Sequence, residues 1–285
     1  TEYAYATTLF LTEEYLPATL TLGYSLREKK VKNNLVCLVQ DTPKTVIING
    51  DKKIYPGISK GAINDLLEIY DVVYGIDLLQ VETPQQNRKK FTKTFAIHYR
   101  NIEFYVTKIQ VLGLINYKKI LYLDASIIVN KKLDYVFYKY KNSYSYDKES
   151  KIMGLRGGFF IFQPSVIVYS KALFLIKYYK KIFGNLYFTR GIDEVILYFS
   201  IYPKWKDNLY WFGCNERFLK KNCPVYYYQI NKPFKEYKNS LAILEGRIDT
   251  FILWDKTARL LLKAYPEFRK YFEHISSFRN FDIKI

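Results

Sequence analysis

Four residues have the types and positions that could do chemistry. Tyr15 and Asp124 each come soon after an apolar segment that we interpret as a strand, and Asp193 and Glu194 open a later apolar helix. Ligands bind at the carboxyl ends of the strands in a parallel sheet, so we expect Tyr15 and Asp124 to face the same crevice. Acidic residues also favour the first turn of any helix, which leaves an ordinary helix start as the alternative for Asp193 and Glu194.

The elements that must position these residues alternate along the first part of the chain. Short apolar runs predict strands, and apolar residues at helical spacing predict helices. We expect strands at 3–10, 35–39, 72–74 and 120–123, and helices at 12–29, 63–70 and 104–116. This alternation predicts an α/β fold with a mostly parallel central sheet and helices on both faces.

The second part of the chain is less regular. We expect a strand at 157–162, helices at 164–181, 193–201 and 250–265, and a flexible Tyr/Lys-rich loop at 134–152. We interpret residues 1–285 as a single domain, with a nucleotide-binding half at 1–124 and an acceptor half with the C-terminal helices at 125–285.

Composition excludes several classes of protein. The 285 residues are 49% hydrophobic and 25% charged, which rules out a disordered or collagen-like chain. No stretch reaches the roughly 18 uncharged apolar residues of a membrane span, and the first residues lack the basic start of a signal peptide. No glycine-rich phosphate loop occurs, and neither His98 nor His274 has the context of a catalytic triad.

The cysteines and the absence of a glycosylation acceptor indicate the compartment of the protein. Cys37 lies in an apolar run and is expected to be buried, Cys214 and Cys223 only weakly suggest a disulfide, and no Asn-x-Ser/Thr acceptor occurs. These features favour the cytoplasm, with a lumenal domain separated from its anchor as the alternative.

The net charge of +17 is compatible with three kinds of binding partner: nucleic acid, an anionic membrane surface or a phosphorylated substrate. Because the lysines are scattered in pairs along the chain, we favour a solvated basic surface and no nucleic-acid partner.

A set of short motifs carries a more specific signal. Residues 119–126, Lys-Ile-Leu-Tyr-Leu-Asp-Ala-Ser, resemble the strand of nucleotide-sugar glycosyltransferases that ends in a metal-binding Asp-Ala-Asp. Five further segments match glycosyltransferase family 8, the glycogenin-like family, in the same order. They are 5–26, 107–109 (Thr-Lys-Ile), 158–165 (Gly-Phe-Phe-Ile-Phe-Gln-Pro-Ser), 191–194 (Gly-Ile-Asp-Glu) and 226–234, which ends in Lys-Pro-Phe. The resemblance runs from about residue 3 to residue 264.

The resemblance implies a Rossmann-like A-type glycosyltransferase fold and a retaining transfer of a hexose from a UDP-sugar to a hydroxyl acceptor. The acceptor would be a protein or a glycan, and a homodimer is compatible with the family. Mn²⁺ would accompany the UDP-sugar, because the leaving diphosphate gains negative charge and needs a cation beside it.

The resemblance also assigns roles to individual residues. Thr8 and Tyr15 would hold the uridine, with Tyr15 stacked on the base, and Asp124 would contact the ribose and the metal. Lys108 would lie at the donor sugar and the phosphates. The remaining expected site residues are Asp193 and Glu194 at the sugar, Ala125, Ser126 and Gly158 in the nucleotide-sugar-binding segments, and Lys232 at the diphosphate.

The chain departs from the family at several of these positions. Ser126 replaces the second metal aspartate, and Tyr226 replaces the metal-binding histidine, with Gln229 in place of a following glycine. Only Asp124 remains as a metal ligand, so Mn²⁺ binding should be weakened or dispensable. Arg156 and Arg190 stand where the family has an asparagine and an aspartate, and with Lys232 they could replace the metal charge.

Each residue also has an interpretation without chemistry. Asp124 could cap a strand end, Tyr15 could pack in the core, and Lys108 could be a solvated helix lysine. Lys232 could belong to a common Lys-Pro loop, and the two arginines could be surface residues. The alternatives to an active transferase are an inactive relative that binds a nucleotide, a sugar or a protein partner, and a basic protein that binds polyanions.

Overall fold

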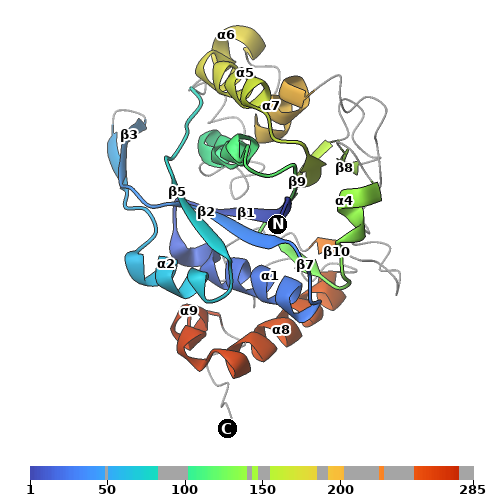
Figure 1. Cartoon of the computed structure of the whole chain (residues 1–285). Helices are drawn as coiled ribbons and strands as arrows, with labels where there is room; N and C mark the ends of the chain where they lie inside the picture. Colours follow the sequence, from blue (N-terminus) through green and yellow to red (C-terminus); the bar gives the residue numbers. More distant parts are fainter. Residues whose placement is uncertain are drawn as a thin grey trace.

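A central sheet of six strands organises the chain (Figure 1). The computed structural model describes residues 1–48, 51–82, 102–139, 143–146, 155–184, 192–201, 225–227 and 247–275. The strands lie in the order β5-β2-β1-β6-β9-β8. Their bounds are β1 (Tyr3–Leu9), β2 (Asn34–Gln40), β5 (Val72–Ile76), β6 (Lys119–Leu123), β8 (Ser143–Tyr146) and β9 (Leu155–Phe162).

Four of these strands are parallel, and two are antiparallel. β5, β2, β1 and β6 pair in parallel, whereas β9 pairs antiparallel with β6, and β8 antiparallel with β9. All but the first residue of β1 and of β2 are buried, as expected for strands covered on both faces. The predicted α/β class with a mostly parallel sheet is therefore confirmed.

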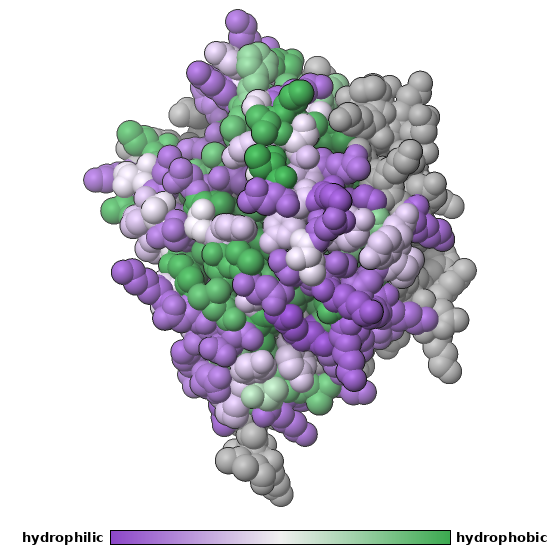
Figure 2. Space-filling view, in the orientation of Figure 1, coloured by the Kyte–Doolittle hydropathy of each residue, from purple (hydrophilic) through white to green (hydrophobic). Residues whose placement is uncertain are grey.

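Helices cover both faces of the sheet (Figure 1). On one face lie α1 (Leu16–Glu28), α2 (Lys60–Leu67), α8 (Arg247–Ala264) and α9 (Arg269–Phe272). On the other face lie the 3-10 helix η2 (Ile102–Gly113), α5 (Val166–Lys177), α6 (Tyr179–Phe183) and α7 (Ile192–Ile201). Among the described residues, no helix combines the length and the apolar composition of a membrane span. Hydrophilic and hydrophobic residues are interspersed over the face shown in Figure 2.

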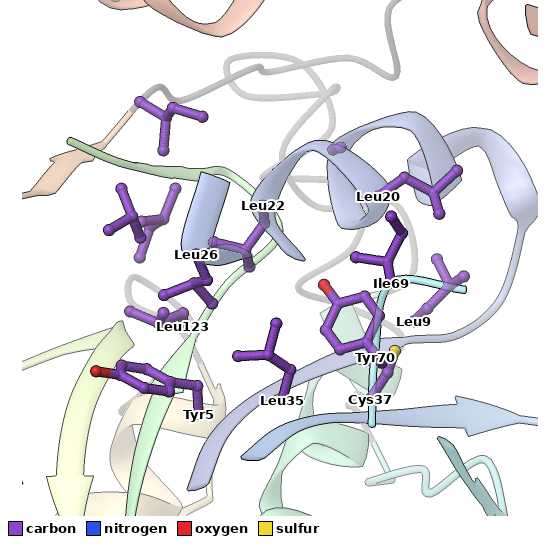
Figure 3. Packing of buried hydrophobic residues seen from close by; sticks show 14 of the residues in the cluster. Tyr5, Leu9, Leu20, Leu22, Leu26, Leu35, Cys37, Ile69, Tyr70 and Leu123 are labelled. Atoms are coloured by element: carbon purple, nitrogen blue, oxygen red, sulfur yellow. The ribbon is translucent and has the colours of Figure 1, made fainter. Parts of the chain in front are cut away.

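The core between α1 and the sheet is closely packed. Figure 3 shows Leu22 and Leu26 of α1 facing Leu35 and Leu123 of the strands, and all four are buried. Gly23 allows α1 to pack closely against Ile69 and Tyr70, because a Cβ atom there would lie 2.5 Å from the Ile69 side chain and 2.8 Å from the Tyr70 ring. Such close packing makes core volume changes costly.

Smaller elements complete the described structure. They are the 3-10 helix η1 (Glu13–Tyr15), the hairpin of β3 (Lys44–Ile48) and β4 (Asp51–Tyr55), β7 (Ile127–Val129), α4 (Tyr135–Lys139), β10 (Val225–Tyr227) and the 3-10 helix η5 (Pro266–Phe268). Thr12 caps η1 by accepting a hydrogen bond of 3.2 Å from the backbone N–H of Glu14, which confirms the predicted helix start.

The predicted elements are confirmed in order, with four differences. The helix predicted at 12–29 is divided into the 3-10 helix η1 and the α-helix α1. The helix predicted at 104–116 is a 3-10 helix that begins at Ile102, and the helix predicted at 164–181 is divided into α5 and α6 at Tyr178. The expected loop at 134–152 is wrong, because it contains α4 and the edge strand β8. Local composition could not reveal β8, since its backbone hydrogen bonds go to β9, a distant partner.

Candidate active site

Asp124 is held at the carboxyl end of β6. Its backbone N–H donates a hydrogen bond of 2.8 Å to the carbonyl of Gly158 on β9, and its own carbonyl accepts one of 3.0 Å from Ile127. These two bonds fix the turn that carries Ala125 and Ser126, both of which are partly buried. The Asp124 side chain therefore projects at the edge of the sheet where ligands of parallel sheets bind.

A chain of hydroxyl groups connects Asp124 to the first strand. The Tyr122 hydroxyl donates to Asp124 Oδ1 at 2.8 Å and lies 2.9 Å from Thr8 Oγ1, which must then act as the donor to Tyr122. Ala6 is paired with Tyr122 across the β1–β6 ladder, and its small side chain leaves room for the ring. Burial and the negative charge of Asp124 raise the pKa of the Tyr122 hydroxyl well above its ordinary value.

Lys108 joins two carboxylates from distant elements. From η2, its Nζ lies 3.2 Å from Asp124 Oδ1 and 2.9 Å from Asp193 Oδ2, and its side chain is only 10% exposed. Burial opposes the charge on Lys108, but Asp124 and Asp193 outweigh that effect and raise the pKa of the ammonium group well above its ordinary value. The interpretation of Lys108 as a solvated helix lysine is therefore wrong.

The two acidic residues of α7 lie against the start of β9. Asp193 is buried, and Glu194 Oε1 accepts a hydrogen bond of 3.0 Å from the backbone N–H of Gly157. A Cβ atom at Gly157 would lie 2.7 Å from Asp193 Oδ2, so this position admits only glycine while Asp193 keeps its place. From the sequence, Gly157 is predicted only as part of the strand at 157–162. Its position next to Gly158 was the available signal for a close approach of the backbone.

Two tyrosines lie within electrostatic reach of this cluster. Tyr15 is partly buried and packs against the core below α1. Its pKa is raised by burial and by the charges of Glu14 and Asp124, so Tyr15 lies within electrostatic range of Asp124. Tyr105 was not predicted as a site residue. Burial, Tyr15 and Asp193 raise its pKa, and it precedes Lys108 by three positions, which places both residues on one side of a 3-10 helix.

The other predicted residues are described only in part. The backbone of Tyr226 pairs with Ile128 of β7, so β10 runs beside the strand that follows Ser126. The backbone of Arg156 pairs with Ser145 on β8. Arg190, Gln229 and Lys232 lie outside the described residues, as do Cys214, Cys223 and His98.

Comparisons with known proteins find similarity to glycosyltransferases. No protein-family model matches the chain. A glycogenin from Neurospora crassa is 26% identical over 129 residues, which is 45% of this chain and 16% of the fungal protein. The glycosyltransferase GlyE of Streptococcus pneumoniae has a similar fold, with a TM-score of 0.57 and 13% identity over 94% of this chain and 64% of GlyE. The galactosyltransferase LgtC, solved with donor and acceptor sugar analogues, also matches, with a TM-score of 0.57 and 12% identity over 95% of this chain and 100% of LgtC.

This chain resembles the glycogenin-like glycosyltransferases of family 8. Its described part has the A-type glycosyltransferase fold, as expected. The alignment with glycogenin spans about a sixth of the fungal protein, so the glycogenin-like chain shares one segment with it and not its full length.

The donor set of the glycogenin-like chain does not suit Mn²⁺ in its present arrangement. The Asp124 carboxylate already accepts hydrogen bonds from Tyr122 and from Lys108, which lies 3.2 and 3.4 Å from its two oxygens. Within the described ranges, no three His, Cys, Asp or Glu side chains gather as metal ligands would. A cation at Asp124 would have to displace Lys108, an internal cation that occupies the same carboxylate.

The charge of the cluster limits what it can bind. One ammonium group between two carboxylates leaves the Lys108, Asp124 and Asp193 group with a net negative charge. A diphosphate carries two or more negative charges, so it would be repelled unless further cations come close. From the sequence, Arg156, Arg190 and Lys232 are the cations expected to fill this role.

Proposed function

We propose that this chain is a glycosyltransferase that moves a hexose from a UDP-sugar to a hydroxyl group, with retention of the anomeric configuration. The observation that carries the proposal is the group of Lys108, Asp124 and Asp193, in which Lys108 and Asp193 are buried and the Asp124 side chain is 28% exposed. The three residues come from η2, the end of β6 and α7, and they meet at the carboxyl edge of the parallel strands. Burying the charges of Lys108 and Asp193 is costly, so a group of this kind is a candidate functional site.

The nucleotide would bind along the line from Thr8 to Asp124. Tyr15 is partly buried and near Asp124, which suits a ring that stacks on a base while Asp124 accepts hydrogen bonds from the ribose. Tyr122 supports this arrangement because its hydroxyl group links Thr8 to Asp124. Lys232, with Arg156 or Arg190, would contribute positive charge at the diphosphate.

The sugar would lie near Asp193 and Glu194. In the reaction the bond between the sugar C1 and the phosphate oxygen breaks, and a bond from C1 to the acceptor oxygen forms. Positive charge develops on the sugar ring as the bond breaks, and the carboxylates of Asp193 and Glu194 would stabilise it. The leaving diphosphate would gain negative charge beside Lys108, and the acceptor hydroxyl would lose its proton to an oxygen of that diphosphate.

Donor turnover tests this proposal. The full chain would be incubated with a panel of UDP-sugars, with and without Mn²⁺, and both release of UDP and binding by calorimetry would be measured. We expect at least one UDP-sugar to be consumed, and we expect Asp193→Asn to lower the rate about 100-fold or more.

The matched control is Asp255→Asn, which removes a carboxylate from an ion pair of 2.7 Å with Arg259 on α8. This control should keep the rate of the unmodified chain, because α8 lies on the other face of the sheet (Figure 1). Binding of UDP without turnover of any donor would contradict a transferase, and so would equal losses in both variants.

A further inference from the structure

The outward side of α5 and α6 carries large apolar side chains in solvent. Val166, Ile167, Phe174, Tyr178 and Ile182 are all exposed, Ile167 to 80% and Phe174 to 56%. The last four recur at intervals of seven, four and four residues and so form one stripe along the two helices. The helices lie at the top of the molecule in Figure 1, where hydrophobic and hydrophilic atoms alternate in Figure 2.

These side chains are not needed for the core. The inner side of the same helices already packs against the sheet through Val168, Ala172, Leu175, Ile176, Tyr179 and Phe183, all of them buried. The helices are therefore apolar on two sides. An exposed apolar stripe on a folded protein marks a surface that binds something.

The residues beside the stripe are basic. Residues 166–184 contain four lysines and no aspartate or glutamate. Lys180 is paired with Glu82 at 2.6 Å, whereas Lys171, Lys177 and Lys181 are exposed on the same side as the stripe. Lys177 Nζ lies 5.5 Å from the centre of the Tyr178 ring, so charge and apolar surface alternate at close range.

We propose that this basic apolar surface, the outward side of residues 166–184, binds the headgroup region of an anionic lipid bilayer. Apolar side chains flanked by lysines are the composition of helices that lie in a membrane interface, because the rings enter the acyl boundary while the ammonium groups meet the lipid phosphates. The net charge of +17 adds attraction to anionic lipid.

A second copy of this chain fits the surface less well. A symmetric dimer builds its interface from the same patch on both copies, so it would gather Lys171, Lys177 and Lys181 of both copies in one interface, and residues 166–184 contain no acidic residue to compensate them. Like charges directly opposed destabilise such an interface. An anionic bilayer has the complementary charge instead.

Membrane binding would bring the candidate active site close to the lipid. α5 packs directly on η2 and α7, which carry Lys108 and Asp193. Only α5 and α6 would then lie between the bilayer and the helices η2 and α7. The inference itself rests on the surface and not on the proposed function, since a chain without transferase activity would bind lipid equally well.

Vesicle sedimentation with the full chain tests the proposal. The probes are vesicles of phosphatidylcholine alone and vesicles that also contain phosphatidylglycerol. We expect affinity for the anionic vesicles to be about tenfold or more above that for the neutral ones, and to fall as salt is added. The double variants Ile167→Ser with Phe174→Ser, and Lys171→Glu with Lys181→Glu, should each weaken binding about tenfold or more.

Leu67→Ser on α2 is the matched control, because Leu67 is 50% exposed and lies on the other face of the sheet. It should bind anionic vesicles like the unmodified chain, and urea unfolding should show that all variants are folded. Equal affinity for both kinds of vesicle would overturn the proposal. So would binding that neither double variant weakens, or an apolar variant that changes only the oligomeric state measured by light scattering.

Discussion

Lys108 of η2 and Asp193 of α7 form an ion pair of 2.9 Å in which the two side chains are only 10% and 6% exposed. The same ammonium group also reaches Asp124 at 3.2 Å. A single lysine thus compensates two carboxylates in a largely desolvated place, and three segments that are distant in the sequence depend on it.

Replacing this lysine should destabilise the fold. Lys108→Met would leave Asp193 buried beside Asp124 with no compensating charge, and we expect a loss of about 3 kcal/mol in the free energy of unfolding. Urea unfolding at neutral pH measures it. Lys118→Met is the control, because the Lys118–Glu2 pair is exposed and should contribute nothing measurable. Equal unfolding midpoints for the two variants would show that the buried pairs do not form.

Tyr122→Phe should lower both the stability of the fold and the affinity for UDP, whereas a matched variant away from the site should lower only the stability. It removes the hydroxyl between Thr8 and Asp124, and we expect a cost of about 1 kcal/mol in the free energy of unfolding together with weaker UDP binding. Tyr70→Phe removes a buried hydroxyl that donates to the Thr19 carbonyl at 2.6 Å, below the sheet and away from the site. It should cost similar stability and leave UDP affinity unchanged in calorimetry. If both variants bind UDP alike, Tyr122 has no positioning role.

Asp193 and Glu194 should keep their positions only if residue 157 is glycine. In Gly157→Ala the new methyl group would press on Asp193 Oδ2 at 2.7 Å and on Glu194 Cγ at 3.1 Å. We expect a loss of about 1–3 kcal/mol and a large fall in donor turnover. Gly61→Ala is the opposite case, because nothing lies within 4 Å of its added methyl group on α2. It should gain about 0.5–1 kcal/mol from helix propensity. Thermal unfolding should show a lower midpoint for Gly157→Ala and a higher midpoint for Gly61→Ala than for the unmodified chain.

Stability should fall at alkaline pH. Burial raises the pKa values of Tyr122, Tyr105, Tyr5 and Cys37, and the carboxylates beside Lys108 raise that of its ammonium group. The folded chain therefore keeps protons that the unfolded chain releases from about pH 8.5 for the thiol and about pH 10 for tyrosine and lysine. Their contribution is complete below those values and is lost as the pH rises towards the folded pKa values.

Urea unfolding from pH 7 to pH 11 measures this loss. Tyr122→Phe removes one of the titrating groups, so the stability of this variant should decline less steeply. A free energy of unfolding that stays constant to pH 11 would contradict the burial of these groups.

Metal dependence should be weak, because Asp124 is engaged by Lys108 and Tyr122 and because Ser126 adds no charge. We expect the affinity for UDP to change little when EDTA replaces Mn²⁺, and to fall in Lys232→Ala but not in Lys118→Ala. Ser126→Asp combined with Tyr226→His should raise the dependence on Mn²⁺. Calorimetry of UDP under both conditions measures these effects. Binding by the unmodified chain only with Mn²⁺ would show that water and Ser126 complete a metal site.

Much of the fold and several site residues could be predicted from the sequence. Apolar runs and helical spacing are local properties, and they identified the four parallel strands and the buried Cys37. The helix start at Thr12, which caps η1, could be recognised from the acidic residues that follow it. Asp124 could be placed at the edge of the sheet for the same reason, because the end of an apolar strand defines that edge. Six motifs in order added the family and the A-type fold.

The tertiary structure decided how the site residues combine. Lys108 could be interpreted as a solvated helix lysine until η2 and α7 packed together and buried it against Asp193. Gly157 and Tyr105 joined the site only through contacts between elements, and the edge strand β8 exists only because β9 pairs with it. The lysines of α5 and α6, scattered in the sequence, share one exposed surface with Ile167 and Phe174. The physical reason is the same in each case: periodicity along the chain encodes which side of an element is buried, whereas ion pairs, close glycine contacts and strand pairing depend on partners that only long-range packing brings within a few ångströms.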